Sequence, residues 1–130
     1  MRRPGLGLAG ALGFSAVALG AFGAHGLKGR LPPSLLEVYR TGALYHLLHA
    51  VAALAVALAP PDRLRRPRLI LTLFAAGVVV FSGSLYALAL TGAPAFGAVT
   101  PVGGLLLLAA WALIAAEALP PRGSRGLPST

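Results

Sequence analysis

The chain of 130 residues contains no cysteine and only 3 acidic residues, and charged residues make up only 11% of it. Without cysteine it forms no disulfide and offers neither a thiolate metal ligand nor a cysteine nucleophile. It also lacks the G-x-S-x-G, Walker and H-E-x-x-H patterns that mark several large classes of enzyme. The sequence therefore favours a protein that is not an enzyme, and it indicates no metal and no other cofactor.

Apolar residues dominate what is present, since 57% of the chain is hydrophobic, too much for an ordinary soluble domain of this size. A transmembrane helix needs about 20 mostly apolar residues, and four stretches qualify, at 6–24, 41–58, 69–90 and 102–119. The predicted fold is all-α, an integral membrane four-helix bundle in which residues 1–119 form a single domain. Residues 120–130 have little apolar surface to bury, so we expect a disordered cytoplasmic tail there.

The excess of basic residues does not require a nucleic-acid partner, because their placement explains them. If the four helices alternate across the membrane, three basic residues lie on one side and eight on the other. The three are Lys28, Arg30 and Arg40, and the eight are Arg2, Arg3, Arg63, Arg65, Arg66, Arg68, Arg122 and Arg125. The positive-inside rule then places both termini and the middle loop in the cytoplasm, in a multi-pass protein of the cytoplasmic (inner) membrane.

The partners expected from this pattern are the lipid bilayer and anionic lipids at its cytoplasmic face. Lipid head groups are predicted to contact the arginines of the middle loop, Arg63, Arg65, Arg66 and Arg68. Glu117 lies near the same side, so we expect it to form a salt bridge with this loop. None of the three acids lies at mid-membrane depth, which argues against a small proton-coupled exporter with a carboxylate in its core.

The second apolar run is the only one with ionisable side chains well inside its length. In a helix, Gly42, His46, His49 and Ala53 fall on one side, while leucines and valines occupy the other. This two-sided pattern predicts a helix that turns its leucines toward lipid and its histidines toward neighbouring helices.

Small residues in the other runs suggest how the helices associate. A line of glycines and alanines lets helix backbones approach closely in a membrane, and we expect this role for Gly13, Gly20, Gly23, Gly42 and Gly83. In the third helix the predicted inner side contains Ala76, Val80, Gly83 and Ala87. Its predicted lipid side contains Phe74, Val78, Phe81, Leu85 and Leu88. Residues 91–101 are predicted to be an uncharged loop, with the fourth helix beginning at Thr100 and Pro101.

Four segments together resemble a known family of small membrane proteins. They are GAFGAHGLK at 20–28, YHLLHA at 45–50, FSGSLYALALTG at 81–92 and TPVGG at 100–104. They are similar to the family of domain of unknown function 423, which itself resembles eukaryotic transmembrane protein 256. The resemblance implies a four-helix protein of the bacterial cytoplasmic membrane without an established activity or ligand. It also implies a glutamine where this chain has His46.

The candidate site follows from depth and helix direction. His25, Tyr45, His46 and His49 are predicted to form a polar site in the outer half of the bundle, with loop 91–101 covering it. A buried histidine of this kind can be a neutral group that bonds a serine or a carbonyl and sets helix register. It can also serve a proton or solute path, or with its neighbours bind a metal or haem.

The sequence favours a non-enzymatic structural or interaction role, as a small membrane subunit or a lipid-associated factor. A partner protein or a second copy of the chain is compatible with this role. The alternative is a small transporter or channel that uses the polar site around His25, Tyr45 and His49.

Overall fold

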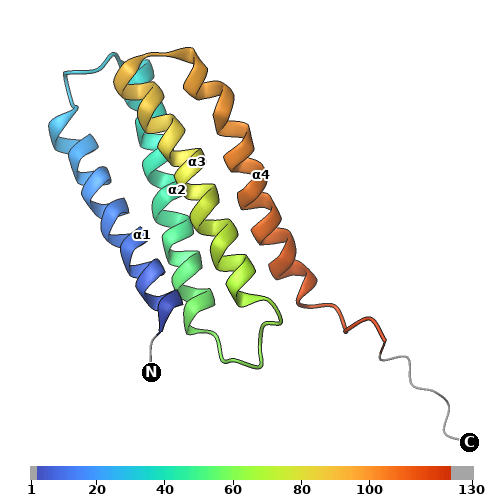
Figure 1. Cartoon of the computed structure of the whole chain (residues 1–130). Helices are drawn as coiled ribbons and strands as arrows, with labels where there is room; N and C mark the ends of the chain where they lie inside the picture. The colour runs from blue at the N-terminus through green and yellow to red at the C-terminus, as the bar shows by residue number, and fades with distance from the viewer. Residues whose placement is uncertain (1–2, 124–130) are drawn as a thin grey trace, which may run out of the picture.

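The computed structural model describes residues 3–123 and consists of helices joined by short links (Figure 1). The helices are α1 (Pro4–Ala21), the π-helical turn η1 (Phe22–Gly26), α2 (Pro33–Leu58), α3 (Pro67–Thr91) and α4 (Pro94–Ala116). Four helical stretches are long and apolar enough to cross a membrane, with α1 and η1 forming one of them. The all-α, four-helix fold class is thereby confirmed. Arg2, Arg125 and most of the predicted tail, residues 124–130, lie outside the described residues.

Each of the four long helices begins with a proline in its first turn. Proline suits this position because its fixed φ matches a helix and its missing N–H would be unpaired there in any case. The sequence therefore sets four helix starts by the same local chemistry.

The predicted loop 91–101 is wrong, because α4 already begins at Pro94. Gly92 ends α3 in the left-handed conformation, with φ of 70°, and the link to α4 is only Gly92 and Ala93. Pro101, expected as a helix start, lies inside α4. In an apolar setting helical hydrogen bonds satisfy the backbone better than a loop does, and transmembrane helices tolerate an internal proline.

The helices pack mainly as neighbours in sequence. α2 and α3 form the central pair, α1 lies mainly on α2, and α4 lies on α3 (Figure 1). Among the described helices, α4 makes close backbone contact with α3 alone. Because α2 and α4 both flank α3 without touching closely, a lateral opening remains between them.

The predicted face of α2 is confirmed, but that of α3 is wrong. On α2, His46, His49 and Ala53 are buried, whereas the leucines on the opposite side are exposed. On α3, Phe74 and Val78 belong to the main core cluster, although the pattern predicted them to face lipid. The reason is that α3 packs against α2 on one side and α4 on another, so it has two buried faces and no single inner seam.

The predicted small-residue contacts divide into two groups. A Cβ on Gly23 would collide with the ring of Tyr39, and one on Gly42 would lie 3.2 Å from both Leu85 and Tyr86, so neighbours pack closely there. Gly13, Gly20 and Gly83 have no such neighbour within 4 Å, so the close contact predicted for them is absent. The tightest approach to a neighbouring backbone is at a residue that the pattern did not single out, Gly103 of α4, where a Cβ would lie 2.3 Å from the backbone nitrogen of Phe81.

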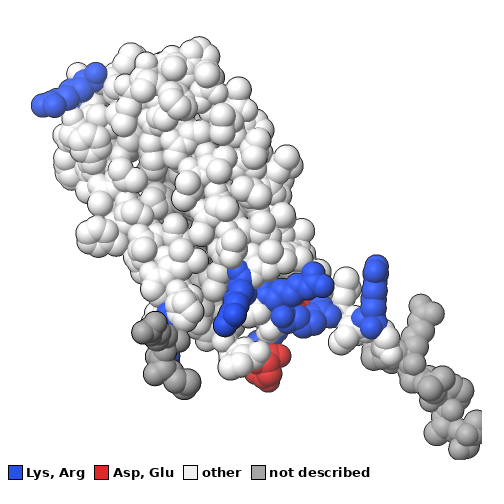
Figure 2. Space-filling view, in the orientation of Figure 1, with Lys and Arg blue, Asp and Glu red and all other residues white. Residues whose placement is uncertain are grey.

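Most of the visible basic side chains gather at one end of the molecule, over the α2–α3 link and the segment after α4; basic side-chain atoms are also visible at the opposite end, and the wall between the ends is uncharged (Figure 2). The start of α1, the end of α2, the start of α3 and the end of α4 all lie at this end (Figure 1). We call it the basic end. Its described arginines are Arg3, Arg63, Arg65, Arg66, Arg68 and Arg122.

Two glycine substitutions test the α3–α4 contact. Gly103→Ala places a methyl group against the backbone of Phe81, so we expect it to destabilise the protein by about 1–3 kcal/mol through overpacking. Gly83→Ala meets open space and improves helix propensity, so its unfolding midpoint in detergent should be unchanged or higher. Equal midpoints for the two variants would contradict this packing.

Candidate functional site

His46 of α2 joins three helices through its two ring nitrogens. Its Nε2 lies 3.0 Å from Ser15 Oγ of α1, and its Nδ1 lies 2.9 Å from the hydroxyl oxygen of Tyr86 of α3. The assignment that satisfies every group has the Ser15 hydroxyl donate to the carbonyl of Ala11 at 2.8 Å and accept from the Nε2–H of His46, while the hydroxyl of Tyr86 donates to Nδ1. In either tautomer both ring nitrogens of His46 have a partner.

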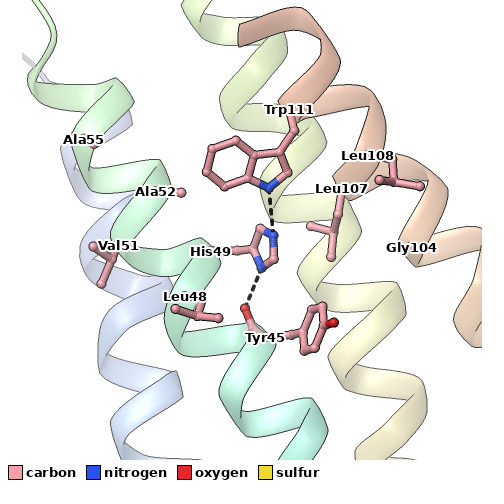
Figure 3. Close-up of a pocket in the computed structure, with 10 residues that line it drawn as sticks. All are labelled: Tyr45, Leu48, His49, Val51, Ala52, Ala55, Gly104, Leu107, Leu108 and Trp111. Carbon is pink, nitrogen blue, oxygen red and sulfur yellow. Dashed lines mark hydrogen bonds between the residues drawn. The ribbon is translucent and has the colours of Figure 1, made fainter. Parts of the chain in front are cut away.

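His49 lies one turn later and joins α2 to α4. Its Nδ1–H donates to the carbonyl of Tyr45 at 2.7 Å, and its Nε2 accepts from the indole N–H of Trp111 at 3.1 Å (Figure 3). The indole N–H can only donate and the carbonyl can only accept, so the tautomer is determined. Both ring nitrogens of His49 therefore have a partner, and its ring also stacks on that of Tyr45 with centroids 5.9 Å apart.

The four predicted site residues do not form one site. His46 faces α1 and α3, whereas His49 and Tyr45 face α4. His25 is exposed in η1, which packs near Tyr39, and Tyr39 lies ten residues or about 15 Å before His49 along α2. The loop expected to cover the site is part of helix α4.

Three partners of these histidines were missed by the sequence reasoning. Ser15 and Tyr86 were not predicted as partners of His46, and Trp111 of α4 was expected only to pack against its neighbours. One signal was present: few side chains in spans one, three and four can hydrogen-bond an imidazole, so matching them to the histidines by depth would have proposed these pairs. Tyr39 adds a similar link, because its hydroxyl donates to the carbonyl of Leu19 in α1.

A groove of about 690 Å³ lies in the opening between α2 and α4 (Figure 3). Tyr45, Leu48 and Ala52 of α2 line one side of it, and Gly104, Leu108 and Trp111 of α4 line the other. The bond between Trp111 and His49 crosses it, so the polar atoms of this pair are already engaged with each other. Apart from the hydroxyl of Tyr45, the groove therefore offers a ligand an apolar surface.

The basic end contains the predicted salt bridge, which is confirmed. Arg65 Nε lies 3.0 Å from Glu117 Oε2, and the same guanidinium donates to the carbonyls of Ala116 and Leu119 at the end of α4. The backbone N–H of Arg65, together with its guanidinium, holds the pKa of the Glu117 carboxyl below its usual value. Arg65, together with the backbone N–H of Arg66, thus links the end of α4 to the residues just before α3. The side chains of Arg63, Arg66 and Arg68 are exposed and have no ion pair among the described residues.

Within residues 3–123, no three side chains of histidine, cysteine, aspartate or glutamate come together as ligands for a metal ion. His46 and His49 point to different helices, so they do not share one ligand position.

Comparison with known proteins identifies the family. Residues 19–104 match the family model described as "Protein of unknown function (DUF423)". The chain belongs to this family. The match covers η1, α2 and α3, together with the end of α1 and the first half of α4, and it includes His25, His46 and His49. It confirms the resemblance found in the sequence.

Several relatives in the same family are described as membrane proteins. The chain is 44% identical to the UPF0382 membrane protein YwdK of Bacillus subtilis, over 80% of this chain and 86% of that protein. It is 41% identical to a UPF0382 membrane protein of Haemophilus influenzae, over 88% and 93% of the two chains. It is 43% identical to the UPF0382 inner membrane protein YgdD of Escherichia coli, over 82% of each. No solved structure matches the chain.

Substitutions at His46 test whether the imidazole acts as a hydrogen-bonded link. His46→Leu leaves the hydroxyl of Tyr86 without its acceptor, and we expect it to lower the free energy of unfolding by about 1–3 kcal/mol. His46→Gln supplies one donor and one acceptor, so it should keep most of the stability. Thermal unfolding in detergent, followed by Trp111 fluorescence, measures both variants, with the exposed His25→Gln as control. If glutamine destabilised as much as leucine, the link would not depend on these hydrogen bonds.

Proposed function

We propose that the protein is a non-catalytic membrane protein that acts by association within the bilayer. Its role is that of a lipid-associated factor or a small subunit of a membrane assembly, with another membrane protein or a second copy as partner. The observation that carries this proposal is that the interior polar groups are used to join helices. Among the described residues, no buried side-chain nitrogen or oxygen is left without a hydrogen-bond partner.

The state of the two histidines argues against catalysis. A general acid or base must exchange a proton with a substrate within hydrogen-bond reach. In His46 and His49 both ring nitrogens are bonded to groups of the protein itself. A substrate would have to break bonds that hold the helices together before it could meet either imidazole.

The competing function, a small transporter or channel, needs a polar path from one end of the molecule to the other. The polar groups of this chain instead form separate links, at Ser15, His46 and Tyr86 on one side of α2 and at His49 and Trp111 on another. His25 lies apart from both links. This arrangement favours association over transport.

Flux measurements in liposomes separate these two functions. We expect the purified chain to leave proton and potassium leakage equal to that of protein-free liposomes, because the interior offers no continuous wetted path. Dyes sensitive to pH and to potassium, enclosed in the liposomes, make the measurement. A flux that appeared with the wild type and disappeared in His46→Leu or His49→Leu would establish transport and overturn the proposal.

We further propose that the protein lies in the cytoplasmic membrane with the basic end in the cytoplasm. The name of the Escherichia coli relative supports the membrane, since it is called an inner membrane protein. The arginines of the basic end support the orientation, since cytoplasmic segments of membrane proteins are enriched in arginine and lysine. Both termini and the α2–α3 link then face the cytoplasm.

Single-cysteine labelling tests this orientation. The chain has no native cysteine, so any label must be on the introduced residue. Pro61→Cys lies at the basic end and Ala95→Cys at the opposite end, and both positions are exposed. A maleimide that cannot cross the membrane should label Ala95→Cys in spheroplasts and should label Pro61→Cys only after lysis. The reverse pattern would show that the basic end faces outward.

A further inference from the structure

The groove between α2 and α4 has the chemistry of a site for a hydrocarbon chain. Its wall consists of leucine, valine, alanine and glycine together with the rings of Tyr45, His49 and Trp111. The Nε2 of His49 and the indole N–H of Trp111 are bonded to each other, so the floor offers no free polar pair to a hydrogen-bonding ligand (Figure 3). The opening lies on the lateral surface, where the surrounding medium is lipid.

The dimensions of the groove match one lipid chain. Along α2 it extends from Tyr45 to Ala55, which is about 15 Å at 1.5 Å per residue, and one leaflet of the hydrocarbon core is also about 15 Å thick. A volume of about 690 Å³ over that length gives a mean cross-section of about 46 Å². A helix with side chains occupies roughly 80–110 Å². The groove can therefore enclose an acyl chain but not a whole helix.

The position of the groove indicates that its lipid lies in the leaflet at the basic end and has a negatively charged head group. It occupies the second half of α2 and the second half of α4, which are the halves that lead to the basic end. Arg63, Arg66 and Arg122 are exposed at that end. A lipid whose chain lay in the groove would place its phosphate among these guanidinium groups, and arginine pairs with phosphate more strongly than neutral donors do.

We infer that the groove between α2 and α4 binds one acyl chain of an anionic phospholipid whose head group lies at the basic end. This inference rests on the proposed function and specifies its ligand class. It gives the groove and the exposed arginines of the basic end one common role, the binding of a lipid. The bond between His49 and Trp111 then holds the groove open at a set width while lacking any direct bond to the lipid.

Trp111 provides a direct probe, since it is the single tryptophan of the chain and lines the groove. The full chain is reconstituted in phosphatidylcholine vesicles that contain a small fraction of phospholipid with brominated acyl chains, which quench tryptophan on contact. At equal mole fraction, brominated phosphatidylglycerol should quench Trp111 more than brominated phosphatidylcholine. The expected enrichment is roughly fivefold for each arginine that contacts the head group.

A matched pair of alanine substitutions tests the location of the lipid. Ala55→Leu fills the groove from α2, whereas Ala109→Leu adds the same side chain to an exposed position of α4 outside the groove. Ala55→Leu should remove the extra quenching by the anionic lipid, and Ala109→Leu should retain it. Arg63→Gln combined with Arg66→Gln should lower the preference for the anionic head group and leave quenching by brominated phosphatidylcholine unchanged. Unfolding midpoints verify that each variant is folded.

Three results would overturn the inference. Equal quenching by the two lipids would show that the site has no preference for an anionic head group. Equal loss of the extra quenching in Ala55→Leu and Ala109→Leu would show that the lipid does not bind in the groove. Quenching that fell as protein density rose would show that a second copy covers the groove instead. The same vesicles report ion flux, so a flux that accompanied normal lipid quenching would contradict the proposed function and leave the lipid site intact.

Discussion

Inside a bilayer a polar side chain must find its hydrogen-bond partner in the protein, and the structure depends on this constraint at α2. His46 and His49 lie one turn apart on this helix, and their four ring nitrogens contact α1, α3, α4 and the carbonyl of Tyr45. In water such bonds would compete with solvent and contribute little. In an apolar medium the cost of leaving an imidazole nitrogen unpaired selects the one register in which all four bonds form.

Close backbone contact supplies the rest of the packing. α4 approaches α3 at Gly103 and Gly77, where a Cβ would collide with Phe81 and Leu107 respectively. Such contacts hold helices together where burial from water gives no driving force. α4 packs closely on α3, and its Trp111 donates a hydrogen bond to His49 of α2, but among the described residues α4 has no close backbone contact with α2, so the groove remains between them.

The ends of the molecule are organised by charge. Arg65 joins the start of α3 to the last carbonyls of α4 and to Glu117, which compensates helix-terminal groups that would otherwise be unpaired. The neighbouring arginines remain exposed at the same end. The basic end therefore combines a structural ion pair with free positive charge, beside a groove of apolar character.

The sequence by itself determined the class of the fold, four membrane-capable helices, and the buried face of α2, because hydropathy and helical period are local properties. It also indicated the pairing of Glu117 with the α2–α3 link, since charge at one end leaves few partners. It misplaced the start of α4, because Thr100 followed by Pro101 resembles a helix start as much as an internal proline. Only the tertiary structure decided that α3 has two buried faces, that α3 and α4 approach most closely at Gly103 and not at Gly83, and that His46 and His49 bond to different helices. These features depend on which helices are neighbours and on how each helix is rotated about its axis. Contacts between residues distant in sequence, such as His49 and Trp111, determine both.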